Sequence, residues 1–429
     1  MNSIDPQEKP LSPKRRSTPR SRFDGLKTFR AFRYRGFPFL FVGVLIMSLG
    51  DVVILVALQW LVLVKTDSTL SLGVVWAARL APLFLWGMLA GAIADRVERK
   101  KLLLCALGTL APLVAFMSTL ISQGWIQVWH VLLFMFVYSS LKTFAVPARE
   151  ALIVDLVGPT EALGAISLSR VAFFATQVLS SLASGYVVET WGIRTALLIV
   201  VSGYVVGFTA LLFVPKMVGP KTGGAAETRF PALSRHFLEG IEMIGRNRAV
   251  LGLVVMAVFC EILGFSHRSL YPVFARDVLR AGASGLGALH ALHASGGLAA
   301  TLALASLGNV RWKGRLILGN MLFFGLFLVL FGQSPWFPLS LVLAALIGAT
   351  AASFDAMQIT LLQLNVGNDQ RGRSIGIWQL SIGFGPIGSL GVGAVAAAAG
   401  ARLAVTLNGL LLVVVFVIVL LVFRRIRRI

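Results

Sequence analysis

The sequence has few charged residues for its length. Asp, Glu, Lys and Arg make up 13% of the 429 residues, whereas 57% are hydrophobic. An ordinary soluble domain carries roughly 25% charged residues. The scarcity of charge therefore excludes a soluble domain as the main part of the protein, and the apolar composition predicts an all-α integral membrane protein.

Cysteine is scarce as well, and the motifs of several chemistries are missing. Cys105 and Cys260 lie within apolar stretches and have neither metal-site nor redox spacing. The sequence has no Gly-x-x-x-x-Gly-Lys-Ser/Thr loop for nucleotide phosphates. It also has no convincing Ser-His-Asp arrangement or paired active-site carboxylates. We therefore expect no enzyme activity, no cofactor and no metal site, and an ion gradient as the source of energy.

Long apolar stretches dominate the rest of the chain. A helix needs about 20 apolar residues to cross the bilayer. Twelve such stretches occur, near residues 37–64, 71–94, 101–121, 127–147, 162–190, 192–214, 250–272, 285–308, 315–332, 337–363, 373–398 and 400–423.

The second half of the sequence repeats features of the first. Residues 157–164 are similar to 366–372, and residues 192–196 are similar to 400–404, at displacements of 209 and 208 residues. Six spans separate the copies, so both enter the membrane in the same sense. The repeat predicts two pseudo-symmetric bundles of six transmembrane helices each.

Acidic residues are few, and the basic ones are unevenly placed. There are 18 acidic and 39 basic residues, giving a net charge of +21. Thirty basic residues lie in the two termini and in alternate connections, and the opposite connections hold only Lys65, Arg194, Arg276, Arg280 and Arg402. By the positive-inside rule, both termini are predicted to be cytoplasmic. The charge thus reports topology, and no nucleic-acid partner is expected.

The expected domains follow from these patterns. Residues 1–36 are predicted to be a basic, disordered cytoplasmic tail without the apolar core of a signal peptide. Bundles over 37–214 and 250–423 are joined by a cytoplasmic linker over 215–249, whose 234–247 part could form a helix on the membrane surface. A second basic tail covers 424–429. Both tails are expected to lie near anionic lipid headgroups.

One segment between the second and third spans combines a glycine, an acid and a basic cluster. It runs from Gly91 through Asp95 to Lys101, and a weaker copy occupies residues 305–315. Together with residues 147–150 and 354–373, this segment resembles the major facilitator superfamily, in particular its drug and siderophore exporters. The resemblance implies a monomeric secondary active transporter of the bacterial plasma (inner) membrane. Such a protein would export a small organic substrate by alternating access in exchange for protons, as an antiporter.

The sequence departs from that pattern in the fifth span. A Gly-Pro signature common in exporters is missing from residues 176–185, and a similar Gly383-Phe-Gly385-Pro386 segment lies in the eleventh span instead. The direction of transport is therefore open. Uptake or lipid flipping by the same fold, and a membrane sensor or scaffold that transports nothing, are the alternatives.

Ionisable residues occur inside spans from which a membrane normally excludes them. Asp51, Lys142, Glu261 and Asp355 lie in the first, fourth, seventh and tenth spans. Such residues usually face a partner or a wet cavity, and the resemblance implies that these four spans line the central cavity. We therefore expect the four residues to contribute to proton coupling or to the substrate cavity.

Depth along the helices suggests a partner for Asp51 and a role for Glu261. Asp51 and Arg79 lie fourteen and fifteen residues from their cytoplasmic ends, so they can form either a structural ion pair or a coupling site. Glu261 lies near mid-membrane. It is a candidate proton carrier, with a protonated acid hydrogen-bonded to the backbone as the alternative reading.

The remaining candidates fall into two groups. Lys142 and Asp355 lie five and eight residues from the predicted cytoplasmic ends, where they could bind a charged substrate or hold the inner gate. His290 and His293 are expected to face His267 and Arg268 in the outer half. These histidines either sense the outside pH or are packing residues.

The segment around Asp95 is the candidate cytoplasmic gate. In the family, such an acid holds the cytoplasmic side against the eleventh helix. Its expected partners here are the start of that helix and Arg371 or Arg373, because a helix N-terminus and arginine both favour an anion. Gly91, Arg96 and Arg99 complete the expected gate.

Overall fold

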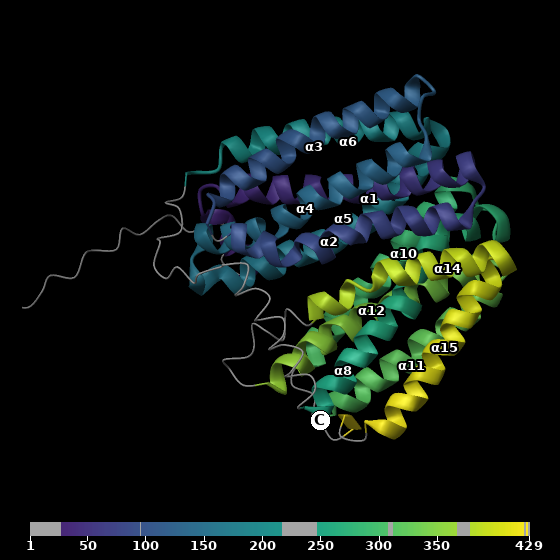
Figure 1. The fold of residues 1–429 in the computed structure, drawn as a ribbon. Helices are drawn as coiled ribbons and strands as arrows, with labels where there is room; N and C mark the ends of the chain where they lie inside the picture. The colour runs from purple at the N-terminus through teal and green to yellow at the C-terminus, as the bar shows by residue number, and fades with distance from the viewer. Residues whose placement is uncertain are drawn as a thin grey trace, which may run out of the picture.

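The computed structural model describes residues 27–94, 96–216, 247–307, 312–366, 378–423 and 426–427. Within these ranges the regular structure is entirely helical, and twelve helices are long and apolar enough to cross a membrane. Six belong to each half of the chain, and each half forms its own bundle (Figure 1). The predicted fold class is confirmed.

The N-terminal half contains six continuous helices. A short helix, η1 (Lys27–Arg33), precedes them. The spans are α1 (Phe37–Thr66), α2 (Thr69–Ala94), α3 (Arg99–Ser122), α4 (Val128–Val157), α5 (Pro159–Thr190) and α6 (Gly192–Leu212). The tight α4–α5 connection depends on Gly158, whose φ of 76° lies in a region that favours glycine. Pro159 then starts α5 with its fixed φ.

The C-terminal half also has six spans, but its first span is interrupted. It runs from Arg248 to Val278 as α8 (Arg248–Phe259), η2 (Cys260–Gly264), η3 (Phe265–Leu270), α9 (Tyr271–Val273) and η4 (Phe274–Val278). The other five contain α10 (Gly282–Leu307), α11 (Lys313–Gln333), α12 (Phe337–Leu364), α14 (Gly385–Ala399) and α15 (Ala401–Val422). The span that contains α14 begins at Trp378.

Two features differ from the sequence-based expectations. Helix α4 continues ten residues beyond the predicted end at 147, because Pro147 is accommodated inside it. Part of the tail expected to be disordered forms η1, which packs against α5 and buries Ala31. The remainder of that tail up to residue 26, the linker residues 217–246 and most of the C-terminal tail lie outside the described residues.

The two halves meet along two helix pairs, α2 with α14 and α5 with α10 (Figure 1). Small residues allow both approaches. A Cβ atom at Gly185 of α5 would lie 3.0 Å from the Cα atom of Gly287 in α10, and one at Gly393 of α14 would lie 3.3 Å from the Cα atom of Gly73 in α2. Close approach of backbones through glycine is a usual device for packing membrane helices.

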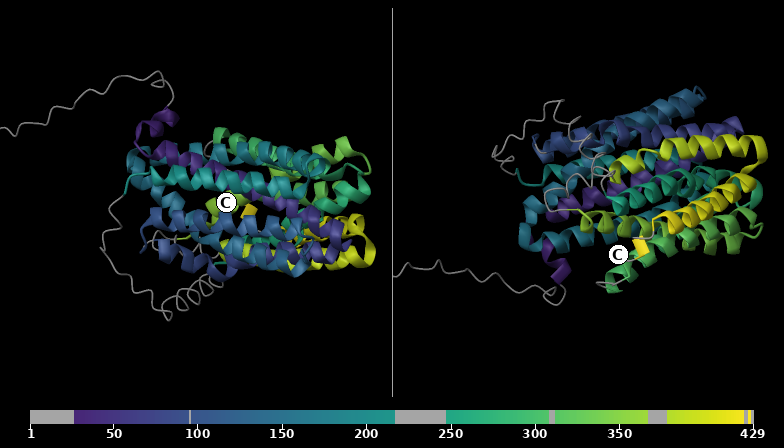
Figure 2. Two further views of the ribbon diagram at one scale, coloured as in Figure 1. Left: turned by 90° about the horizontal axis from the view of Figure 1, so that it is seen from above. Right: turned by 60° about the horizontal axis from the view of Figure 1, so that its bottom comes forward.

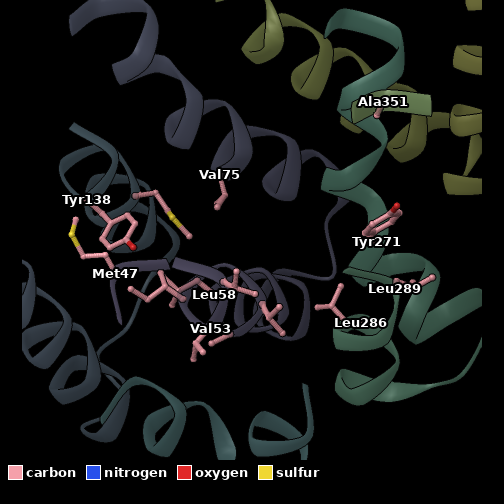
Figure 3. Packing of buried hydrophobic residues seen from close by; sticks show 14 of the residues in the cluster. Met47, Val53, Leu58, Val75, Tyr138, Tyr271, Leu286, Leu289 and Ala351 are labelled. Carbon is pink, nitrogen blue, oxygen red and sulfur yellow. The ribbon is translucent and has the colours of Figure 1, made fainter. Parts of the chain in front are cut away.

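These contacts lie towards one end of the molecule. The spans of both bundles run in roughly the same direction (Figure 2). We call the end that carries Asp67, Glu189 and Arg276 the closed face, and the opposite end, which carries Gly91, Arg99 and Glu150, the open face. Buried side chains from both halves, including Leu58 of α1 and Leu286 of α10, belong to one hydrophobic cluster (Figure 3).

Candidate functional site

A cavity of about 470 Å³ lies along α2 and α4 and extends towards the open face. Its wall follows from helical spacing, because residues four apart lie on one side of a helix. Arg79, Leu83, Gly87 and Gly91 form such a stripe on α2. Opposite them lie Ser139, Lys142, Thr143, Val146, Pro147 and Glu150 of α4.

Asp51 of α1 lies at the deep end of this cavity, between two cations. Its Oδ1 accepts a 2.8 Å hydrogen bond from Nη2 of Arg79, and its Oδ2 lies 2.8 Å from Nζ of Lys142. The pair predicted for Asp51 and Arg79 is present. One carboxylate thus faces two positive charges, and Nη1 of Arg79 has no hydrogen-bond partner among the described residues.

The position of Lys142 corrects the estimate of its depth. Counted from a helix end at 147, Lys142 belongs near the cytoplasmic surface with Asp355. Because α4 ends at Val157, Lys142 is fifteen residues from that end, the same separation as Arg79 has from Ala94. Lys142 therefore reaches Asp51 in its own half.

Two buried tyrosines, Tyr138 and Tyr204, pack beside this three-residue cluster. Nζ of Lys142 lies 5.7 Å from the centre of the Tyr138 ring, and the hydroxyl groups of Tyr138 and Tyr204 are 2.9 Å apart. Gly50 makes room for Tyr204, since a Cβ atom at Gly50 would lie 2.6 Å from the tyrosine ring. The cluster is held on α1, α2 and α4 by buried packing.

The C-terminal half contains a second cluster of ionisable residues. Glu261 lies in the π-helical segment η2, and a Cβ atom at Gly385 of α14 would be 3.6 Å from its Oε2 atom. Asp355 of α12 and Arg268 of η3 are close enough to act on Glu261 electrostatically. Breaks of this kind in a helix are frequent at functional sites.

The predicted histidine group is brought together by Tyr271. His267 Nε2 lies 3.1 Å from the Tyr271 hydroxyl, which lies 3.2 Å from His293 Nδ1. His290 bonds instead to Gln59 of α1, at 3.2 Å. Arg268 does not bond to these imidazoles in any described contact and lies over the Trp76 ring of α2, at 5.4 Å.

Sequence reasoning missed the polar contacts that join the halves at the closed face. Arg276 of η4 forms an ion pair with Asp67, which follows α1. Oε2 of Glu189 in α5 accepts a 2.7 Å hydrogen bond from the Ser284 backbone N–H, and the Thr69 hydroxyl donates to the Gly393 carbonyl at 3.0 Å. The available signal was the opposite charges in connections predicted to share one membrane face.

Only part of the candidate gate is described. Asp95, Arg371 and Arg373 lie outside the described residues, and Arg96 is exposed. Gly91 lines the cavity, and a Cβ atom there would meet no heavy atom within 4 Å. Arg99 pairs with Asp155 of α4 at 2.5 Å, inside the N-terminal half.

Two six-helix bundles joined at one face, with a charged cavity that extends towards the other face, are the architecture of a membrane transporter of the major facilitator superfamily. Within that class, the chain belongs to the family described as "Transmembrane secretion effector", whose model matches residues 26–428. Proteins of this superfamily are transporters and not enzymes.

Individual comparisons agree with this assignment. The chain is 27% identical over 405 residues to "Enterobactin exporter EntS" of Escherichia coli, covering 91% of this chain and 93% of that protein. It is 22% identical over 342 residues to "Macrolide efflux protein A" of Streptococcus pyogenes, covering 78% and 82%. The crystal structure of a mutant of the nucleoside transporter NupG shares the fold, with a TM-score of 0.75, 13% identity and coverage of 90% and 99%.

The predicted family, fold and transporter class are therefore confirmed. The twelve spans and the bacterial efflux relatives also make the chain a multi-pass protein of the bacterial inner membrane.

Proposed function

We propose that this protein exports a small organic solute from the cytoplasm by proton-coupled alternating access. The observation that carries the proposal is a cavity with buried charge that extends towards one face, while the halves are joined at the opposite face. This is the arrangement expected of one end state of a transport cycle. Relatives named for macrolide efflux and enterobactin export support outward transport of a drug-like or siderophore-like compound.

The open face is proposed to be cytoplasmic, with both termini on that side. Arg99, Lys100 and Arg149 lie at this end, and the sequence adds basic residues in both termini and in the linker. The positive-inside rule supports this orientation. A solute from the cytoplasm would then enter the cavity directly, and the basic tails would face anionic lipids.

Protons are proposed to enter through carboxylates such as Glu261, Asp51 or Asp355. Two carboxyl groups that lie close together inside a membrane protein disfavour simultaneous ionisation, and Glu261 and Asp355 form such a pair. Asp51 is the corresponding carboxyl group of the other half. A cycle would exchange protons from outside for solute from inside, in a chain that acts as a monomer.

The gate proposal concerns Asp95 and its expected partners Arg371 and Arg373. Changing Asp95 to Asn should loosen the cytoplasmic closure and lower transport at normal membrane insertion. Unchanged transport by that variant would remove Asp95 from the gate.

The test compares solutes released by cells that produce the wild-type chain, Glu261→Gln or the control Glu161→Gln at equal membrane abundance. Glu161 lies near Arg30, away from the cavity lining. Untargeted mass spectrometry of the medium should find a solute enriched by wild type and by Glu161→Gln, and much less by Glu261→Gln.

The other outcomes are equally informative. Equal release by all three chains would support export and remove Glu261 from proton coupling. If no chain enriches a solute, export is wrong; a depleted solute would indicate uptake, and altered lipid asymmetry would indicate flipping. If no solute flux is found and only the deletion of residues 1–30 alters the phenotype of the cells, the scaffold alternative is favoured.

A further inference from the structure

The charges at the deep end of the cavity do not balance. Asp51 supplies one negative charge, while Arg79 and Lys142 supply two positive charges within 2.8 Å of its oxygens. Their side chains are only 11%, 17% and 21% exposed, respectively. An unpaired charge in such surroundings is costly unless another group neutralises it.

Among the described residues of the same half, no other acid supplies the missing anion. Glu150 lines the cavity nearer the open face, but it has its own basic partners: Arg170 at 3.0 Å and Arg149 at 3.6 Å. Glu261 and Asp355 lie in the opposite half, where Arg268 is their nearby cation. Nη1 of Arg79, a buried donor, also has no hydrogen-bond partner among the described residues.

The space beside the cluster has a distinct character. Leu80, Leu83, Val146 and Pro147 provide apolar surface between the cluster and the open face, and Gly87 and Gly91 add no side-chain bulk. A ligand that fits would place a charged group at the deep end and an apolar body along α2 and α4. At about 470 Å³, the cavity lies within the usual range of small-molecule sites.

We propose that Lys142 and Arg79 bind the anionic group of an amphiphilic organic anion, and that Asp51 occupies this anion site when the cavity is empty. The ligand anion and the Asp51 carboxylate compete for the same two cations. The arrangement therefore selects organic anions over neutral molecules or cations of equal size. This inference deepens the proposed function and rests on it for its role in transport, but its test measures binding alone.

The experiment uses the purified full chain in nanodiscs of zwitterionic lipid, with no ion gradient. Three probes of similar size differ in charge: naphthalene-2-sulfonate, naphthalene-2-sulfonamide and naphthalen-2-ylmethylammonium. Binding is measured by isothermal titration calorimetry. Titrations into empty nanodiscs correct for partition of the probes into lipid. Wild type should bind the sulfonate at least about tenfold more tightly than the other two probes, as expected for charge-assisted hydrogen bonds.

Variants assign the binding to the cluster. Lys142→Gln should weaken sulfonate binding about tenfold with little change for the sulfonamide, and Lys142→Arg should restore most of it. Asp51→Asn should strengthen sulfonate binding, because the competing carboxylate is gone. Lys65→Gln, which removes a charge whose described contact is the Ile126 carbonyl outside the cavity, should behave as wild type.

Several results would overturn the inference. Equal binding of all three probes, preference for the cation, or equal loss of sulfonate and sulfonamide binding in Lys142→Gln would each do so. If Asp51→Asn fails to give monodisperse protein, the Lys142 variants decide alone. Selective anion binding without any exported solute would sustain the anion site and refute export; an exported neutral solute without anion selectivity would do the reverse.

Discussion

Gln59 of α1 joins the two halves through both ends of its amide. Its Oε1 lies 3.2 Å from Nε2 of His290 in α10, and its Nε2 donates to the Arg268 carbonyl at 3.5 Å. Gln59 and His290 are both buried. Opening of the closed face must break these contacts, so they contribute to the balance between the two end states.

The first prediction concerns this link. Gln59→Leu should shift the population towards opening at the closed face, because it removes both of these hydrogen bonds between the halves and leaves Nε2 of His290 without its described partner. The cost of such a loss is about 1–3 kcal/mol, which corresponds to roughly a fivefold or larger shift. Spin labels at the exposed positions Gln123 and Ala398 would report a longer distance. Gln333→Leu, which removes a bond to Thr406 inside one half, is the matched control and should leave the distance distribution unchanged.

The second prediction concerns the glycine contact between α5 and α10. A Cβ atom at Gly287 would overlap the Ser181 carbonyl and lie 2.9 Å from the Cα atom of Gly185. Gly287→Ala should therefore separate the halves at the closed face, at a cost of about 1–3 kcal/mol, and lower export several-fold. Gly391→Ala is the control, since its Cβ atom would meet nothing within 4 Å. Equal export by the two variants would show that this contact does not limit the cycle.

The third prediction concerns stability at the end of α6. Lys100 is 9% exposed, and its Nζ donates to the carbonyls of Leu212, at 2.9 Å, and Val214. Lys100→Met should destabilise the protein by about 1–3 kcal/mol, because the carbonyls of Leu212 and the buried Val214 lose a charged donor. Lys101→Met removes only an exposed pair with Glu98 and should cost less than about 1 kcal/mol. The thermal unfolding midpoints of the two variants are measured by size-exclusion chromatography after heating. Similar midpoints for both variants would contradict the assigned role of Lys100.

The fourth prediction separates Arg99 from the gate. Its carboxylate partner is Asp155, at 2.5 Å and within the same half. Arg99→Gln should therefore lower the thermal unfolding midpoint and leave the distance between the halves at the open face nearly unchanged. The exchange Arg99→Asp with Asp155→Arg should recover part of the lost stability. Spin labels at the exposed residues Leu163 and Trp312 would detect a change between the halves and show whether Arg99 controls the gate instead.

The sequence predicts the fold well because membrane spans are set by length and apolarity alone. It also predicts the Asp51–Arg79 pair, since each residue lies in a span with a clear cytoplasmic end from which depth can be counted. It fails for Lys142, because the fourth apolar stretch ends at Pro147, whereas α4 continues through Pro147 to Val157. A depth counted along a membrane helix is therefore correct only when the helix end has been placed correctly.

Contacts between the halves were beyond sequence reasoning. Gln59 with His290 and Glu189 with Ser284 join residues 231 and 95 positions apart, and neither has a local pattern that names its partner. The breaks in the seventh span were also missed, because a π-helical segment such as Cys260–Gly264 keeps the apolar composition of an ordinary helix. Such features depend on tertiary packing rather than on composition.

The cluster of Asp51, Arg79 and Lys142 belongs wholly to the first repeat, and the linked His267, Tyr271 and His293 belong wholly to the second. The two halves thus share a six-helix scaffold and differ in the chemistry of their polar clusters. Substitutions in the first cluster therefore leave the described hydrogen bonds of the second cluster intact, whereas Gln59 and His290 connect the two halves and must stay compatible. Hybrids that combine the first copy of one relative with the second copy of another offer a direct route to new cargo preferences.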